Sequence, residues 1–225
     1  MNATSNLHSV RVSYDAVAVD YARLLESELA RKPLDRAMLA AFAECVRDGD
    51  GGPGRAVADL GCGPGRVTAH LSGLGVRAFG VDLSPAMVAV ARRSHPGLRF
   101  EVGSMAALDV ADGVLGGVLL WYSTVHTPPQ DLPPVFAECA RVLAPGGHLL
   151  IAFKAGEYRT RLERAYGHPV DLDVYGVPPE RVAALLTGAG LTEVARLVRE
   201  PDDGERSPQG FLLARTPDTD APGPP

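Results

Sequence analysis

The stretch VADLGCGPGRVTAHL, residues 57–71, decides the fold. A short apolar run at 56–60 leads into a turn with three glycines in five residues, and a helical pattern follows at 66–74. A glycine-rich turn between a strand and a helix lets the backbone approach a nucleotide-like ligand closely. Asp59 stands two residues before the first glycine, so the ligand must tolerate a carboxylate beside it.

Strands and helices alternate in the residues that follow this turn. Strands separated by helices of this length need crossover connections, so we expect a mainly parallel sheet with helices on both faces. The sequence therefore predicts an α/β, doubly wound, Rossmann-like fold. We expect buried strands at 56–60, 76–82, 98–103, 114–123 and 148–154, and helices at 66–74, 84–94 and 132–143.

The C-terminal part of the chain has a different pattern. A helix expected at 178–186 precedes two strand-like runs, 191–200 and 211–216. The ten residues between these runs leave no room for a crossover helix, so we expect an antiparallel hairpin. The last residues, 217–225, are polar and rich in proline, and we expect them to be disordered.

Apolar residues recur at helical spacing from 15 to 46, and Pro33 is expected to separate two helices there. A loop rich in glycine and aspartate at 47–55 separates these helices from the first strand. We therefore expect one domain at 1–216, built from an N-terminal helical cap at 14–48 and a core at 55–216.

Composition narrows the class of partner. The 225 residues carry a formal net charge of −5, which gives no overall electrostatic reason to bind nucleic acid, so a small-molecule substrate is expected. No apolar run approaches the roughly 20 residues that span a bilayer, and the first residues lack a signal-peptide pattern. Three widely spaced cysteines without a metal-ligand pattern fit reduced thiols in the cytoplasm. Nothing in the sequence indicates an oligomeric state.

Asp82 ends the second expected strand, where its two oxygens could accept both ribose hydroxyls of a nucleotide. A dinucleotide fits the turn poorly, because Arg66 replaces the third glycine of GxGxxG and Asp59 would repel a pyrophosphate. A cationic ligand such as S-adenosylmethionine would be attracted to Asp59 instead. A nicotinamide-dependent oxidoreductase remains the alternative enzyme class.

Three segments together carry a family resemblance. VADLGCGPGRVTAHL, GVDLSPAMVAVAR and RVLAPGGHLLIAF resemble the class I S-adenosylmethionine-dependent methyltransferases of the small-molecule type, and the likeness extends over roughly 55–216. The resemblance implies a seven-stranded sheet with an antiparallel last strand and S-adenosylmethionine as cofactor. It also implies in-line methyl transfer to an O, N or C nucleophile of a small acceptor, with release of S-adenosylhomocysteine. A non-catalytic cofactor-binding scaffold is the other alternative.

The resemblance also assigns cofactor contacts. Asp59 would attract the ammonium directly or through water, Asp82 would bind the ribose, and Ser104 takes the position of an acidic residue that accepts a hydrogen bond from the adenine. Asp109 could substitute for Ser104 only if its loop folds back. The remaining expected cofactor contacts are Tyr14, Tyr21, Gly61, Cys62, Gly63, Leu83, Met87, Met105, Trp121 and Tyr122.

His126 follows the fourth expected strand and is the candidate general base, since a neutral imidazole could take a proton from a hydroxyl or amine nucleophile. A structural loop histidine is the competing interpretation. His168, with Asp171 and Tyr175, falls where relatives line the substrate pocket. Three basic residues could meet a carboxylate there, although a solvated face is the more common role for such side chains: Lys154, Arg159 and Arg161.

Overall fold

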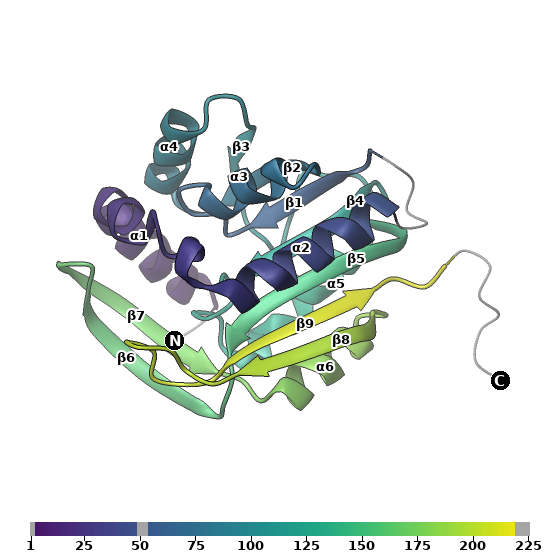
Figure 1. The fold of residues 1–225 in the computed structure, drawn as a ribbon. Helices are drawn as coiled ribbons and strands as arrows, with labels where there is room; N and C mark the ends of the chain where they lie inside the picture. The colour runs from purple at the N-terminus through teal and green to yellow at the C-terminus, as the bar shows by residue number, and fades with distance from the viewer. Residues whose placement is uncertain (1–2, 49–53, 219–225) are drawn as a thin grey trace.

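The structure, a computed structural model, describes residues 3–48 and 54–218. A twisted sheet runs through the centre of the molecule (Figure 1). Its strands are β1 (Ala56–Leu60), β2 (Arg77–Asp82), β3 (Phe100–Val102), β4 (Leu115–Trp121), β5 (Leu143–Lys154), β8 (Thr192–Arg199) and β9 (Gln209–Arg215). They lie in the order β3-β2-β1-β4-β5-β9-β8, and β9 runs in the direction opposite to the other six strands. The doubly wound fold with an antiparallel last strand is confirmed.

Helices cover both faces of this sheet, as crossover connections require. The helical elements are α1 (Ala3–Leu25), η1 (Leu29–Arg31), α2 (Pro33–Asp48), α3 (Arg66–Gly73), α4 (Pro85–Ser94), η2 (Pro129–Asp131), α5 (Leu132–Val142) and α6 (Pro179–Gly188). Ser84 caps α4 as expected, because its side chain accepts a hydrogen bond from the Met87 amide at 3.1 Å.

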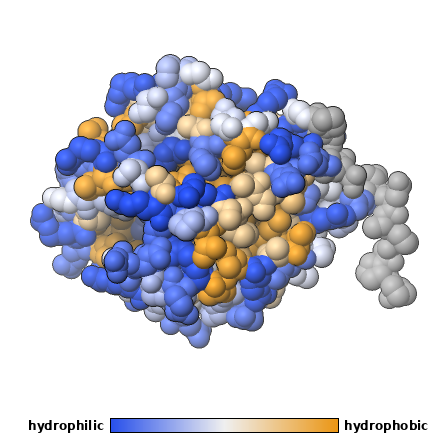
Figure 2. All heavy atoms as spheres, viewed as in Figure 1, coloured by the Kyte–Doolittle hydropathy of each residue, from blue (hydrophilic) through white to orange (hydrophobic). Residues whose placement is uncertain are grey.

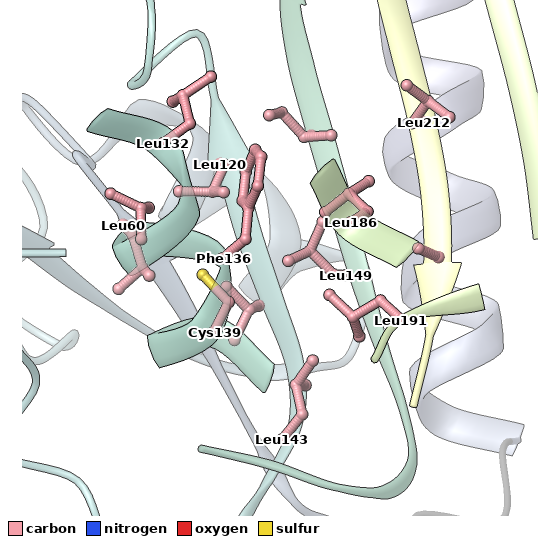
Figure 3. Close-up of a cluster of buried hydrophobic side chains, with 14 of the residues drawn as sticks. Leu60, Leu120, Leu132, Phe136, Cys139, Leu143, Leu149, Leu186, Leu191 and Leu212 are labelled. Carbon is pink, nitrogen blue, oxygen red and sulfur yellow. The ribbon is translucent and has the colours of Figure 1, made fainter. Parts of the chain in front are cut away.

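The larger core cluster lies between the sheet and the helices α5 and α6. Figure 3 shows Phe136 of α5 pointing toward Leu120 of β4 and Leu149 of β5, with Leu186 of α6 beside them. These four side chains are almost fully buried. This cluster fixes the helices of one face against the middle strands of the sheet.

On the opposite face, α2 packs unusually close to β4. A Cβ added at Gly117 would lie 2.8 Å from Val46 and 2.9 Å from Phe42, so only glycine admits this approach. This position in β4 therefore serves helix packing. Figure 2 shows hydrophobic residues gathered on this side, over the region where α2 and β8 lie in Figure 1.

A second, two-stranded sheet was not expected from the sequence. It is a hairpin formed by β6 (Tyr158–Ala165) and β7 (His168–Gly176), and it lies below α1, away from the main sheet (Figure 1). Tyr166 and Gly167 form its turn with φ angles of 52° and 86°, the left-handed pair that a two-residue hairpin turn requires. Strand β7 packs against α1, so the hairpin and the helix form one cover.

Several element boundaries differ from expectation. Helix α1 begins at Ala3 rather than near residue 15. Strand β5 begins at Leu143 rather than at residue 148, because Leu143 pairs with Leu115 of β4 before an irregularity in the register. At the C-terminus, the Pro217 carbonyl still accepts a hydrogen bond from the Gly146 amide at 3.2 Å. The expected disorder of the residues from 219 onward lies outside the described part of the chain.

No helix within residues 3–48 and 54–218 combines the length and the apolar character needed to cross a membrane.

Candidate active site

A cavity of about 410 Å³ opens at the carboxyl ends of the parallel strands. The end of each strand from β1 to β5 contributes to its wall, and α1 with the β6–β7 hairpin covers it. Chain order reverses between β1 and β4, and doubly wound sheets bind their ligands at such a switch point. A smaller cavity of about 30 Å³ adjoins it beside the glycine turn.

The glycine turn is held against the end of β2. The amides of Gly61 and Cys62 both donate to the Val81 carbonyl, at 2.7 and 3.1 Å. Gly61 has φ of 70°, and a Cβ there would lie 2.3 Å from the Cβ of Ser123, so the turn tolerates no side chain at this position. The Cys62 side chain is buried in an apolar cluster with Phe100, so this residue offers the cavity its backbone.

Asp82 is oriented before any ligand arrives. One carboxylate oxygen accepts from the Gly63 amide and the other from the Ser84 amide, both at 2.8 Å. Burial raises the pKa of Asp82, although these two amides favour its ionised form. Each oxygen keeps lone-pair capacity toward the main cavity, which Asp82 lines.

Asp59 is almost fully buried and lines the small cavity rather than the large one. Its Oδ2 accepts from the Thr68 hydroxyl at 2.6 Å, whereas its Oδ1 has no hydrogen-bond partner. Burial raises the pKa of Asp59 to about 7. Arg66 lines both cavities, pairs with Glu28 at 2.6 Å, and also leaves one guanidinium nitrogen unpartnered. The sequence offered Arg66 only as a departure from GxGxxG.

Further candidate contacts lie on the side of the cavity formed by β2 and β3. Ser104 uses its hydroxyl to accept from the Ala106 amide at 3.2 Å. Asp109 is exposed and does not line the cavity, so its loop does not fold back toward the site. The expected residues that do line this side are Gly63, Leu83, Met87, Ser104 and Met105.

Trp121 and Tyr122 both reach the cavity from the end of β4. The Trp121 ring packs against Phe211 at 5.6 Å between centroids, in the core beneath the site. Tyr122 has φ of 56°, a strained value for a residue with a side chain, and its amide donates to the Ala152 carbonyl at 2.9 Å. Its buried hydroxyl has no hydrogen-bond partner.

Three tyrosines form an aromatic wall under the cover. Tyr14 and Tyr21 lie on the same face of α1 with their rings 6.0 Å apart, and Tyr21 packs edge-on against Tyr166 at 4.8 Å. All three line the main cavity. Tyr166 was not identified from the sequence, because its position depends on the hairpin that the sequence analysis missed.

His126 is 8% exposed and both its ring nitrogens are engaged. Nδ1 lies 2.6 Å from the Asp173 carbonyl, which can only accept, so Nδ1 carries the hydrogen. Nε2 is then the acceptor in the neutral ring and takes a hydrogen bond from the Tyr14 hydroxyl at 2.9 Å. Burial lowers the pKa of His126, and the charge of Lys154 lowers it further.

The expectation that His168, Asp171 and Tyr175 line the substrate pocket is wrong, because none of the three lines the cavity. His168 binds Asp20 of α1 at 2.8 Å on the surface, and Asp171 pairs with Arg161 across the hairpin. Arg159 likewise pairs with Asp173, at 2.8 Å. Lys154 does not lie on a solvated face, because its side chain is half-buried and lines the cavity.

The described residues contain no group of three or more His, Cys, Asp or Glu side chains arranged to hold a metal ion.

Comparisons with known proteins bear on this site. A family model described as a methyltransferase domain matches residues 57–147. Trans-aconitate 2-methyltransferase of Methylobacterium nodulans is 33% identical over 62% of this chain and 51% of its own length. Ubiquinone biosynthesis O-methyltransferase of Xanthomonas oryzae is 30% identical over 66% of this chain and 68% of its own length. The chain thus spans about half the length of the first of these relatives.

Among solved structures, magnesium protoporphyrin IX methyltransferase from Synechocystis superposes with a TM-score of 0.71 and 17% identity, over 94% of this chain and 97% of that one. At this identity the likeness concerns the fold. The sequence comparisons go further, because the family model spans the glycine turn and the strands around it, and the Xanthomonas relative is 30% identical over 68% of its own length. The chain belongs to the class I S-adenosylmethionine-dependent methyltransferases.

Proposed function

We propose that this chain binds S-adenosylmethionine in the main cavity and transfers its methyl group to an O, N or C nucleophile of a small-molecule acceptor. One observation carries this proposal. A single cavity joins the preoriented Asp82 and the glycine turn to the hydrogen-bonded pair of Tyr14 and His126. The names of both curated relatives, which concern trans-aconitate and ubiquinone biosynthesis, support a small acceptor.

The polar groups with free hydrogen-bonding capacity support one orientation of the cofactor. Asp82 binds the ribose hydroxyls with its free lone pairs, and the unpartnered Asp59 oxygen faces the α-ammonium. The unpartnered Arg66 nitrogen suits the carboxylate of the methionine part. The adenine lies by Leu83, Met87, Ser104 and Met105, while Trp121 and Tyr122 contact the methionine end and Tyr14 and Tyr21 cover it.

The reaction is an in-line displacement at an already activated sulfonium, so catalysis rests mainly on holding the nucleophile in line with the methyl group. For a hydroxyl or amine nucleophile, we propose that the proton leaves through Tyr14. The nucleophile gives its proton to the Tyr14 oxygen while Tyr14 passes its own proton to Nε2 of His126. The Asp173 carbonyl stabilises the resulting imidazolium at Nδ1.

The first test measures which cofactor the chain binds and whether Asp82 is needed for that binding. S-Adenosylhomocysteine at about 100 times its Kd should stabilise the wild-type protein by roughly 2.7 kcal/mol, and NAD(H) should give no shift. The shift should disappear in Asp82→Ala and persist in Asp109→Ala, whose side chain is exposed and outside the cavity. A loss in both variants, or in neither, would contradict the placement of the ribose at Asp82.

Turnover is then measured as S-adenosylhomocysteine released from labelled S-adenosylmethionine in the presence of a panel of phenols, amines and carboxylic acids. Release with at least one acceptor supports methyl transfer. Tight cofactor binding without release on any acceptor would favour the non-catalytic scaffold instead.

A further inference from the structure

Lys154 brings an unmatched positive charge to the main cavity. Its side chain stands at the end of β5, opposite Gln209 in the register with β9, and is half-buried. Within the described part of the chain, no hydrogen bond or ion pair joins its amine to another residue. The other charged side chains on the cavity wall are engaged, namely Glu28 with Arg66, Asp35 and Glu205 with Arg199, and Asp82 with two amides.

Burial leaves this amine short of hydration. It lowers the pKa of Lys154, and the nearby charges of Glu205 and Glu28 offset that only in part. Glu205 accepts from Lys32 at 2.8 Å and from Arg199 at 2.6 Å, so it is not available to move toward Lys154. A bound anion would supply the partner that the protein does not.

A second donor lies at the same end of the cavity. The Tyr122 hydroxyl is buried without a hydrogen-bond partner. Tyr122 follows β4, and its amide donates to the Ala152 carbonyl of β5, two residues before Lys154, so both side chains enter the same cavity from adjacent strand ends. An ammonium and a phenol hydroxyl directed at one end of a cavity suit a ligand oxygen that carries negative charge.

The end of the cavity at Lys154 is distant from the end at Asp82, where we place the ribose and adenine of the cofactor. Asp82 ends β2 and Lys154 ends β5, and three strand spacings of about 4.8 Å separate them in the sheet. Arg66 and the glycine turn line the small cavity, where we place the methionine part of the cofactor, and Lys154 does not line that cavity. The charge of Lys154 contributes to the lowered pKa of His126, so the amine lies within electrostatic range of the proposed reaction centre.

We infer that Lys154 binds an anionic group of the methyl acceptor, a carboxylate or a phosphate, with the Tyr122 hydroxyl as a second donor. The inference rests on the proposed function, which places an acceptor between this amine and His126. The body of the acceptor then meets apolar walls from the cover, formed by Leu7, Val10, Leu162, Leu172 and Val174.

The test uses the full chain saturated with S-adenosylhomocysteine and titrated with benzoate, phenyl phosphate and the neutral benzamide. Benzoate, phenyl phosphate or both should bind, and benzamide should not; which anion binds more tightly distinguishes a carboxylate site from a phosphate site. Lys154→Met should weaken anion binding about tenfold to hundredfold, while Lys154→Arg keeps most of it. Arg93→Met removes one exposed charge on α4 and should change nothing.

Three results with the probe ligands would overturn the inference. They are equal binding of the anions to wild type and Lys154→Met, binding of benzamide as tight as that of the better-bound anion, and no anion binding to wild type. A matching loss of S-adenosylhomocysteine affinity in Lys154→Met would also overturn it, by assigning Lys154 to the cofactor carboxylate. Because binding is measured without turnover, a chain that releases no product with any acceptor would still give a readable result here.

Discussion

The protonation chemistry of His126 depends on hydrogen-bond partners that are distant in the sequence. The strand pattern predicts that His126 lies shortly after β4, near the carboxyl edge of the sheet. Its chemistry depends on Tyr14, 112 residues earlier, and on the Asp173 carbonyl, 47 residues later. Neither contact leaves a periodic signal in the sequence, so the tautomer and the route of the proton could not be predicted from it.

This pairing predicts a distinct pH dependence. Burial lowers the pKa of His126, so its basic form persists at pH values below the ordinary 6.5, and the acid limb of kcat should lie below that value. For an acceptor that must lose a proton, His126→Gln should reduce kcat by about 10²–10⁴-fold and Tyr14→Phe should also reduce it. The measurement is kcat against pH with saturating cofactor.

The matched control is His168→Gln, because His168 lies outside the cavity and binds Asp20. It should leave the acid limb where it is in the wild type. Unchanged kcat across pH in His126→Gln would remove His126 from the reaction without affecting the family assignment.

At the scale of elements, local signals explain both the successes and the failure of sequence-based prediction. The helix α4 was placed correctly, because Ser84, Pro85 and the stop at 95–97 are short-range signals. The hairpin β6–β7 was missed, because β6 has little apolar pattern and lies mostly exposed. Strand β7 did carry a signal, since Val170, Leu172 and Val174 alternate with polar residues, as a strand with one covered face requires.

A part-buried carboxylate at the start of α4 helps to hold the cover over the cavity against the core. Asp15 of α1 accepts from the Ser84 hydroxyl at 2.6 Å and from the Ala86 amide at 3.1 Å, at the start of α4. Asp15→Ala should loosen α1 and weaken S-adenosylhomocysteine binding about tenfold, and it should raise amide hydrogen exchange in residues 3–25. Calorimetric titration and exchange mass spectrometry measure the two effects.

Asp20→Ala provides the comparison on the same helix. Asp20 pairs with His168 and Arg23 at the surface, where such pairs contribute little, so binding and exchange should stay near wild type. Equal exchange in Asp15→Ala and the wild type would mean that packing, rather than this contact, holds the helix in place.

At the scale of the whole molecule, we expect Asp59 to couple folding to cofactor binding. Its pKa is raised to about 7 in the folded protein, against 3.8 as the ordinary value. Between these values the folded chain keeps a proton that the unfolded chain has lost, so the free energy of unfolding falls as pH rises through this range. The ligand-free fold is therefore less stable at neutral pH because of a carboxylate that the proposed ammonium would satisfy.

Asp59→Asn tests this coupling, since the amide has no charge to bury and can still accept from Thr68. Without ligand, the variant should be more stable than wild type at pH 8 by about 1–3 kcal/mol and should lose that advantage near pH 4.

In the wild-type protein, the ammonium of the ligand favours the ionised form of Asp59. S-Adenosylhomocysteine binding should therefore release a proton and become tighter as pH rises from about 6 to 8. Denaturant unfolding and titration calorimetry in buffers of different ionisation enthalpy measure both effects. Asp109→Asn, at an exposed position, should show neither. Proton release that persists in Asp59→Asn would assign the coupling to another group.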